Sequence, residues 1–201
     1  CIGQVEGNPF RERIDRMGRA SNCRVALVYV PAVKQWVFGL PDDVIVRAAQ
    51  LIKPWHWVAR PAAGAVLRVP TAKAGSLYQA SRAATYLALS PHPAVHRGGK
   101  LILEASLPEG LGSEAGFVRA LQRYRPPWLE VLTGERPTGA GAQRIIMLAL
   151  LAQNYKLSIR GCRDPEVFQA IGIEASAEPA EVPDGWLDVT DPFTCIPQWR
   201  G

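Results

Sequence analysis

Short apolar segments alternate with helix signals along the middle of this chain, and this alternation limits its possible folds. The apolar segments typical of buried strands lie at Ala65–Val69, Lys100–Ala105 and Tyr155–Arg160. The segments between them carry helix signals, including a serine that suits a helix N-terminus and the apolar run Ile145–Ala152. Because parallel strands need such crossovers, the sequence predicts an α/β layered domain with a mostly parallel sheet flanked by helices.

The N-terminal part carries signals of its own. Asn8 and Pro9 suit the start of a helix, because asparagine caps free N–H groups and proline lacks the N–H that would stay unpaired there. Two further segments, Arg24–Val30 and Gln35–Phe38, predict a β-hairpin. Asp42 then predicts the start of a second helix.

The C-terminal part differs in charge and composition. Residues 160–201 contain three arginines and eight acidic residues, whereas residues 1–159 contain 20 Lys and Arg against 10 Asp and Glu. Prolines recur from Glu174 onward, which predicts an irregular tail rather than further core elements. We therefore expect an α/β domain over residues 1–173 and an acidic, proline-containing tail over residues 174–201.

Composition excludes several classes of protein. With 201 residues, 48% hydrophobic and 20% charged, the chain can fold without metal or disulfide support. The run Ile145–Ala152 is far shorter than the ~20 residues that span a bilayer, so no membrane association is expected. Cys1, Cys23, Cys162 and Cys195 show no C-x-x-C spacing, which indicates neither zinc nor a disulfide framework. We therefore expect a cytoplasmic protein.

The net charge of +5 permits binding to nucleic acid but does not favour it. The first predicted helix carries four arginines and two interleaved acids: Arg11, Glu12, Arg13, Asp15, Arg16 and Arg19. Such alternation is typical of a solvated helix face, so no nucleic-acid partner is expected. Arginine makes up 18 of the 23 basic residues. This either favours bidentate contacts with carboxylate or phosphate, or only reflects a composition in which arginine replaces lysine.

Ser76-Leu-Tyr-Gln79, followed by Arg82, is the first candidate for a binding site. Gln79 and Arg82 lie three residues apart and share a helix face, near a helix N-terminus that attracts anions. A substrate carboxylate could bind Arg82 in bidentate fashion and accept a hydrogen bond from Gln79. The same Ser-x-x-Gln spacing is also a capping box, in which Gln79 only satisfies the Ser76 N–H.

Two glycine-rich turns precede predicted helices. Gly110-x-Gly112 and Gly139-x-Gly141 could bring backbone N–H groups close to a ligand. Neither turn matches a dinucleotide fingerprint or a P-loop. Tight strand-to-helix turns explain both patterns equally well.

Metal binding and nucleophilic catalysis have little support. His92 and His96 have the spacing of two ligands on one helix face, but Pro91 and Pro93 prevent that helix. No serine or cysteine stands in a recognisable nucleophile motif. Cys162 directly follows a predicted strand, and we expect it to be a small buried side chain.

The order of motifs resembles the C-terminal domain of the lactate racemase family, the nickel-pincer-nucleotide-dependent 2-hydroxyacid racemases and epimerases. No single motif carries the resemblance, which rests on their series over about residues 7–173. The motifs are Gly7-Asn8-Pro9, Gly39-Leu-Pro-Asp42, Ser76-Leu-Tyr-Gln-Ala80, Arg97-Gly-Gly-Lys-Leu-Ile-Leu103, Glu109-Gly-Leu-Gly112, Ala142-Gln-Arg144 and Arg163-Asp-Pro165.

The resemblance implies a division of labour between two domains. An N-terminal domain in cis, outside this chain, would bind the nickel-pincer nucleotide and supply the histidines that ligate nickel and move the proton. This chain would close the cleft over a small anionic 2-hydroxy acid and contribute no catalytic residue and no metal ligand of its own. No cofactor is expected in this chain, and the resemblance assigns it no cofactor-binding residue. Because the chain opens on Cys1 rather than methionine, we expect a fragment that is inactive alone.

The family's Y-Q-x-x-K stretch implies substrate-binding residues here. Gln79 matches its glutamine, and Arg82 stands in place of its lysine, which keeps the charge but changes the geometry. Gly141 stands where the family has a tryptophan, and these departures mark a divergent branch. The competing hypothesis is a non-catalytic α/β module whose basic face binds an acidic partner.

Overall fold

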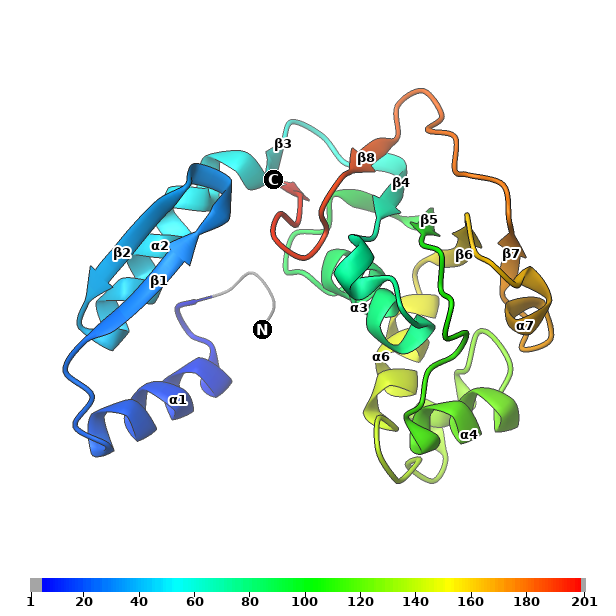
Figure 1. The fold of residues 1–201 in the computed structure, drawn as a ribbon, viewed down its shortest axis with the longest axis horizontal. Helices are drawn as coiled ribbons and strands as arrows, with labels where there is room; N and C mark the ends of the chain where they lie inside the picture. Colours follow the sequence, from blue (N-terminus) through cyan, green and yellow to red (C-terminus); the bar gives the residue numbers. More distant parts are fainter. Residues whose placement is uncertain (1–4, 200–201) are drawn as a thin grey trace.

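A five-stranded parallel sheet forms the centre of the larger part of the molecule (Figure 1). A computed structural model describes residues 5–199, and for residues 53–56 the backbone only, so Cys1 lies outside the described residues. The strands are β4 (Ala62–Arg68), β5 (Val95–Glu104), β6 (Lys156–Arg160), β7 (Glu174–Ser176) and β8 (Leu187–Val189). They lie in the order β7-β6-β5-β4-β8, and every neighbouring pair is parallel. The predicted α/β fold is confirmed.

Helices pack on one face of this sheet. In each strand every second side chain points to that face, and these side chains form the core with the helices. The helices are α3 (Leu77–Ala88), α4 (Ala115–Arg123), α5 (Glu130–Thr133), α6 (Gln143–Ala152) and α7 (Pro165–Gln169). Leu67, Leu101 and Leu103 are fully buried and share one core with Leu77 of α3 and Leu148 of α6. Helix α3 contacts both β5 and α6, so this core fixes α3 and α6 relative to one another.

The N-terminal residues form a smaller unit with a core of its own. Its elements are α1 (Pro9–Ala20), β1 (Ala26–Val30), a 3-10 turn (Pro31–Val33), β2 (Gln35–Gly39) and α2 (Pro41–His56). The predicted helix start is confirmed, since Asn8 Oδ1 accepts hydrogen bonds from the N–H groups of Phe10 and Arg11. The predicted hairpin is confirmed too. On its buried side, Val30 and Val37 share a small core with Val44 of α2.

The C-terminal segment contributes more to the sheet than the sequence predicts. Most of residues 174–199 are irregular, but β7 and β8 form the two edges of the sheet, with Ala175 and Val189 buried in the main core. A second two-stranded sheet joins β9 (Gln198–Trp199) to β3 (Trp57–Val58). Strands of two or three residues are too short for a period-2 pattern to reveal them. The boundary at residue 173 stays a prediction.

None of the helices in the described part of the chain is both long and apolar enough to cross a membrane.

Candidate functional site

Helix α3 carries Gln79 and Arg82, the two predicted binding residues. Both side chains are partly exposed, whereas the neighbouring Leu77, Ala80 and Ala83 are fully buried. Neither Gln79 nor Arg82 donates a side-chain hydrogen bond to another described residue, and Arg82 Nε is buried without an acceptor. The two polar groups are therefore held by the backbone of α3 and remain able to bind a ligand.

The N-terminus of α3 itself does not offer the free N–H groups that the sequence predicts. The N–H groups of Leu77 and Tyr78 donate to the carbonyl oxygens of Gly110 and Leu111, at 2.8 and 3.3 Å. The Ser76 side chain makes no capping hydrogen bond either, so the expected capping box is also wrong. A neighbouring loop satisfies this helix end, and any anion at α3 must be bound by side chains.

A second arginine from α6 completes a cationic cluster on α3. The guanidinium carbon Cζ of Arg82 lies 5.5 Å from the centroid of the Tyr78 ring, and that of Arg144 lies 5.9 Å from it. Arg144 Nη1 also donates to Thr85 Oγ1 at 3.2 Å. We call Tyr78, Arg82 and Arg144 the arginine pair site. Cation–π contacts hold both guanidiniums at one aromatic ring.

The arginine pair site is electrostatically unbalanced. Burial lowers the pKa of Arg144, and the nearby charge of Arg82 lowers that pKa further. Among the described residues, no carboxylate forms an ion pair with either arginine. Glu114 lies close by, with its Cβ beside Gly141 and its Oε2 beside Gly112, but it forms no ion pair with these arginines. The site therefore favours a small anion.

Both glycine-rich turns accept hydrogen bonds from the N-termini of neighbouring helices. The turn with Gly110 caps α3, as described above, and Ala140 of the other turn accepts hydrogen bonds from the N–H groups of Gly116 and Phe117 at the start of α4. Gly141 has φ +75°, and a Cβ there would lie 2.9 Å from Tyr78 Cε2. Gly110-x-Gly112 follows β5 and precedes α4, as a strand-to-helix turn does, whereas Gly139-x-Gly141 joins α5 to α6 and follows no strand.

One solved structure resembles this chain over almost its whole length. The lactate racemase apoprotein from Thermoanaerobacterium thermosaccharolyticum matches 98% of this chain with a TM-score of 0.72, at 17% identity. The chain has a lactate-racemase-like fold. A protein of Thermotoga maritima matches 96% of it, with a TM-score of 0.61 at 11% identity. The chain spans about half the length of each, 51% and 54% respectively. No protein-family model and no curated protein matches it.

The sequence also raises His92 with His96 as possible metal ligands and Cys162 as a possible nucleophile. His92 lies in an irregular segment and His96 in β5, so they do not share a helix face. Cys162 is buried, its thiol donates to the Ser176 carbonyl oxygen at 3.3 Å, and burial raises its pKa. The interpretation of Cys162 as a small buried side chain is confirmed.

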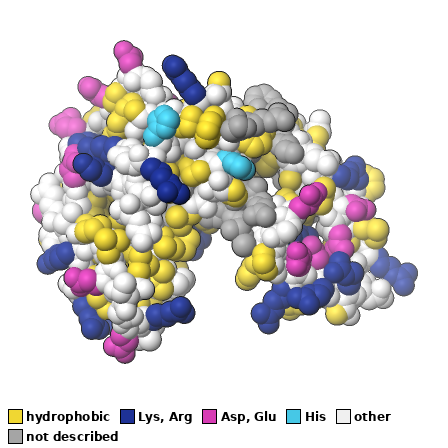
Figure 2. Space-filling model, turned by 180° about the vertical axis from the view of Figure 1, so that it is seen from behind, with side chains coloured by type: hydrophobic (Ala, Val, Ile, Leu, Met, Phe, Trp, Pro, Cys, Tyr) yellow, Lys and Arg dark blue, Asp and Glu magenta, His cyan; other side chains and the backbone are white. Residues whose placement is uncertain are grey.

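The basic helix α1 carries its own counter-charges. Arg11 forms an ion pair with Asp15, and Arg19 forms one with Asp42 of α2. Figure 2 shows Lys and Arg side chains along the outer edge of the smaller unit, with acidic side chains close by. This mixture is typical of a solvated face, as the sequence predicts.

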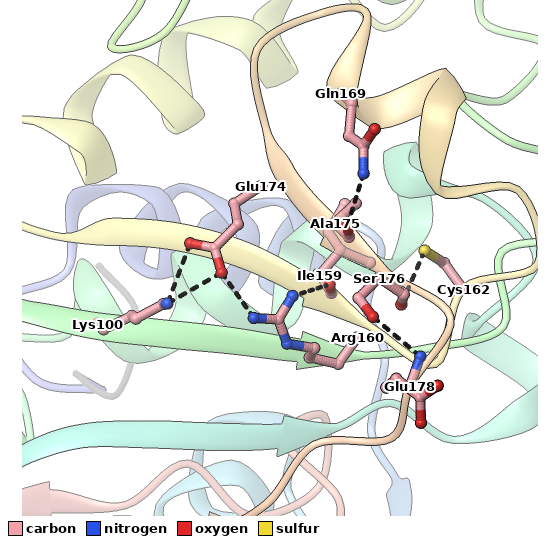
Figure 3. Close-up of polar contacts among 9 residues, drawn as sticks. All are labelled: Lys100, Ile159, Arg160, Cys162, Gln169, Glu174, Ala175, Ser176 and Glu178. Atoms are coloured by element: carbon pink, nitrogen blue, oxygen red, sulfur yellow. Dashed lines mark hydrogen bonds and ion pairs between the residues drawn. The ribbon is translucent and has the colours of Figure 1, made fainter.

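A second polar cluster covers the other face of the sheet (Figure 3). Glu174 of β7 accepts from Lys100 Nζ at 3.1 Å and from Arg160 Nη2 at 2.6 Å. Nearer the carboxyl ends of the strands, Arg68 pairs with Glu104 at 2.8 Å and with Asp188 at 2.7 Å. These opposite charges balance one another, so this cluster joins the edge strands rather than leaving a charge for a ligand.

Glu174→Gln should therefore destabilise the fold slightly and in a pH-dependent way. Lys100 and then Arg160 lower the pKa of Glu174, so its ion pairs stabilise the fold above the unfolded-state pKa and are lost as pH falls through the folded-state value. Because the Glu174 side chain is 55% exposed, we expect at most about 1 kcal/mol near neutral pH. Urea unfolding of both proteins at about pH 7 and about pH 3 measures this difference. Glu178→Gln, which removes an exposed acid without an ion pair, is the control; an E174Q effect that persists at the lower pH would contradict the assignment.

Proposed function

We propose that this chain is the C-terminal, cleft-closing half of a 2-hydroxyacid racemase or epimerase, in which Arg82, assisted by Gln79, holds the substrate carboxylate. The observation that carries the proposal is the arginine pair site, where neither of two guanidiniums at one aromatic ring forms an ion pair among the described residues. The likeness to the lactate racemase apoprotein gives the chemical context.

Inverting the hydroxyl-bearing carbon of a 2-hydroxy acid requires that its carboxylate stay fixed while the bonds at that carbon change. Arg82 can donate two parallel N–H···O hydrogen bonds to a carboxylate, and a guanidinium keeps its charge at any working pH. Gln79 lies one turn earlier and can donate a further hydrogen bond through its amide. Holding the acid at one end restricts the reacting carbon to a small volume.

The nickel ligands are proposed to come from the domain in cis and not from this chain. The described residues contain no group of three or more His, Cys, Asp or Glu side chains that could hold a metal ion. We assign no reaction step to the nickel-pincer nucleotide. The role of this chain is to bind and orient the substrate.

The β-hairpin offers support for a further domain in cis. Leu27 and Tyr29 of β1 face Phe38 and Trp36 of β2 across the ladder, and all four side chains are between 44% and 69% exposed. Helix α1 adds three more exposed apolar side chains: Phe10, Ile14 and Met17. Exposed apolar side chains of this kind, gathered on one face of the hairpin, are typical of a surface covered by a partner. The N-terminal domain that the proposal requires would be that partner.

Two experiments test the proposal. Reading the coding sequence directly upstream of Cys1 should show a histidine-containing cofactor domain, and an immediate start codon there would contradict it. The full-length protein assembled with the nickel-pincer nucleotide should then interconvert the enantiomers of at least one acid from a panel of 2-hydroxy acids, followed by chiral chromatography. Failure with the whole panel, when authentic lactate racemase loaded in parallel is active, would contradict the proposed reaction.

The unbalanced charge of the arginine pair site also favours the competing function, binding of an acidic protein partner. Such binding would weaken steeply as salt rises, because exposed charges are screened. It would also occur without the cofactor and without any turnover of a 2-hydroxy acid. The racemisation assay above therefore distinguishes the two functions.

A further inference from the structure

Arg144 lies outside the residues that the sequence or the family resemblance points to as binding groups, yet the structure places it beside Arg82. The two side chains come from α6 and α3, and they meet at the ring of Tyr78. The hydrogen bond from Arg144 Nη1 to Thr85 Oγ1 fixes the second guanidinium against α3 without neutralising it.

Both guanidiniums have donors that no described residue satisfies. Arg82 Nε and Arg144 Nε are each buried without a hydrogen-bond partner. A buried donor on a charged group is costly to leave unpaired, and Tyr78 can offer only its ring face to the cations. Because both Nε atoms are shielded from solvent, an anion from outside would bind the terminal N–H groups of the guanidiniums. Two cations that form no ion pair among the described residues carry charge for more than one anionic group.

A substrate with a single negative charge does not neutralise both guanidiniums of this site. A substrate with one carboxylate can neutralise Arg82 or Arg144 but leaves the charge of the other, which is partly removed from water. Glu114 lies near Tyr78, since a Cβ at Gly112 would contact both Glu114 Oε2 and Tyr78 Cβ, but among the described residues it forms no ion pair with either arginine. A larger residue at position 141 could not supply a compensating negative charge, because a Cβ there would lie 2.7 Å from Glu114 Cβ.

We infer that the arginine pair site binds a small dianion, with one anionic group on Arg82 and the second on Arg144. This inference rests on the proposed function and narrows it: the substrate is a 2-hydroxy acid that carries a second carboxylate or a phosphate. Arg144 is then the residue that selects dianionic from monoanionic substrates, and Arg82 binds the carboxylate common to both.

Calorimetric titration of the cofactor-free full-length protein tests the inference without any enzymatic turnover. The probes are L-malate, 3-phosphoglycerate and L-lactate, which are all 2-hydroxy acids and differ in their second anionic group. At least one dianion should bind about tenfold or more tightly than lactate, as expected for one extra charge-assisted contact. The order of malate and phosphoglycerate distinguishes a second carboxylate from a phosphate.

Arg144→Gln should lower the affinity for the preferred dianion about tenfold and change lactate binding by less than about twofold. Arg144→Lys, which keeps the charge, should recover part of the dianion affinity and shows that the loss is not a folding defect. Arg60→Gln removes an exposed arginine without an ion pair among the described residues and should change neither affinity. Thermal unfolding of each variant checks the fold.

Three results would overturn the inference: equal affinities for malate, phosphoglycerate and lactate; an equal loss of all three in R144Q; or no binding of any probe. The first two leave the proposed racemase function intact, because a monoanionic substrate would then suffice. Conversely, selective dianion binding by a protein that inverts none of the acids tested would contradict the proposed function and keep the dianion site.

Discussion

Arg82→Gln should lower kcat/KM of the cofactor-loaded full-length protein for its 2-hydroxy acid by roughly 100-fold, equivalent to ~3 kcal/mol. The variant removes a charged bidentate donor but keeps an amide of similar length. Because the substrate carboxylate has the same charge in the ground state and the transition state, most of the loss should appear in KM. Steady-state kinetics of enantiomer interconversion measure both constants.

The fold should hardly respond to this change. The Arg82 side chain donates no hydrogen bond to another described residue, and its described contact is with the Tyr78 ring, so the melting temperature of R82Q should stay close to that of the wild type. Arg82→Lys should restore part of the lost activity, since it returns the charge without the bidentate geometry. Unchanged kinetics in R82Q would remove the carboxylate-binding role from this residue.

Gly116→Ala should lower the free energy of unfolding by about 2–3 kcal/mol, because an added methyl group has no space. A Cβ at Gly116 would lie 2.6 Å from the Gly139 carbonyl carbon and 2.7 Å from the Ala140 carbonyl oxygen, and neither is a flexible side-chain end. The turn would have to move away from α4 and lose the hydrogen bonds that Ala140 accepts there. Urea unfolding of the purified chain measures the change.

Gly18→Ala is the matched control, since Gly18 is also a helical glycine. Nothing lies within 4 Å of a Cβ at that position in α1. Alanine there should leave stability unchanged or raise it by roughly 0.5–1 kcal/mol, because it reduces the freedom of the unfolded chain. Equal effects of the two substitutions would show that the close contact between α4 and the turn does not exist.

The helices and central strands could be predicted because their signals are local. Asn8 caps α1 through its own side chain, and in β6 the apolar Leu157 and Ile159 alternate with polar residues, as in a strand with one face toward the core. The hairpin register likewise follows from alternation within two adjacent segments. Strand β8 could not be predicted in this way, since it pairs with β4 across more than a hundred residues and has only three residues of its own.

The candidate site was predictable only in part. Gln79 and Arg82 share one helix, so their spacing shows that they lie on one face. Arg144 has no local signal that connects it to Arg82, because the two meet only through the packing of α6 against α3. The capping of α3 by Gly110 and Leu111 is also a tertiary contact, and for this reason the sequence wrongly suggested an anion-binding helix end.

A crystal structure of the full-length protein with its 2-hydroxy acid bound would show directly whether α3 holds the substrate. We expect the substrate carboxylate within hydrogen-bond distance of the Arg82 guanidinium and the Gln79 amide, on the face of α3 that also holds Tyr78. A substrate carboxylate bound elsewhere, with Arg82 and Gln79 making no contact to it, would rule out the proposed role of both residues.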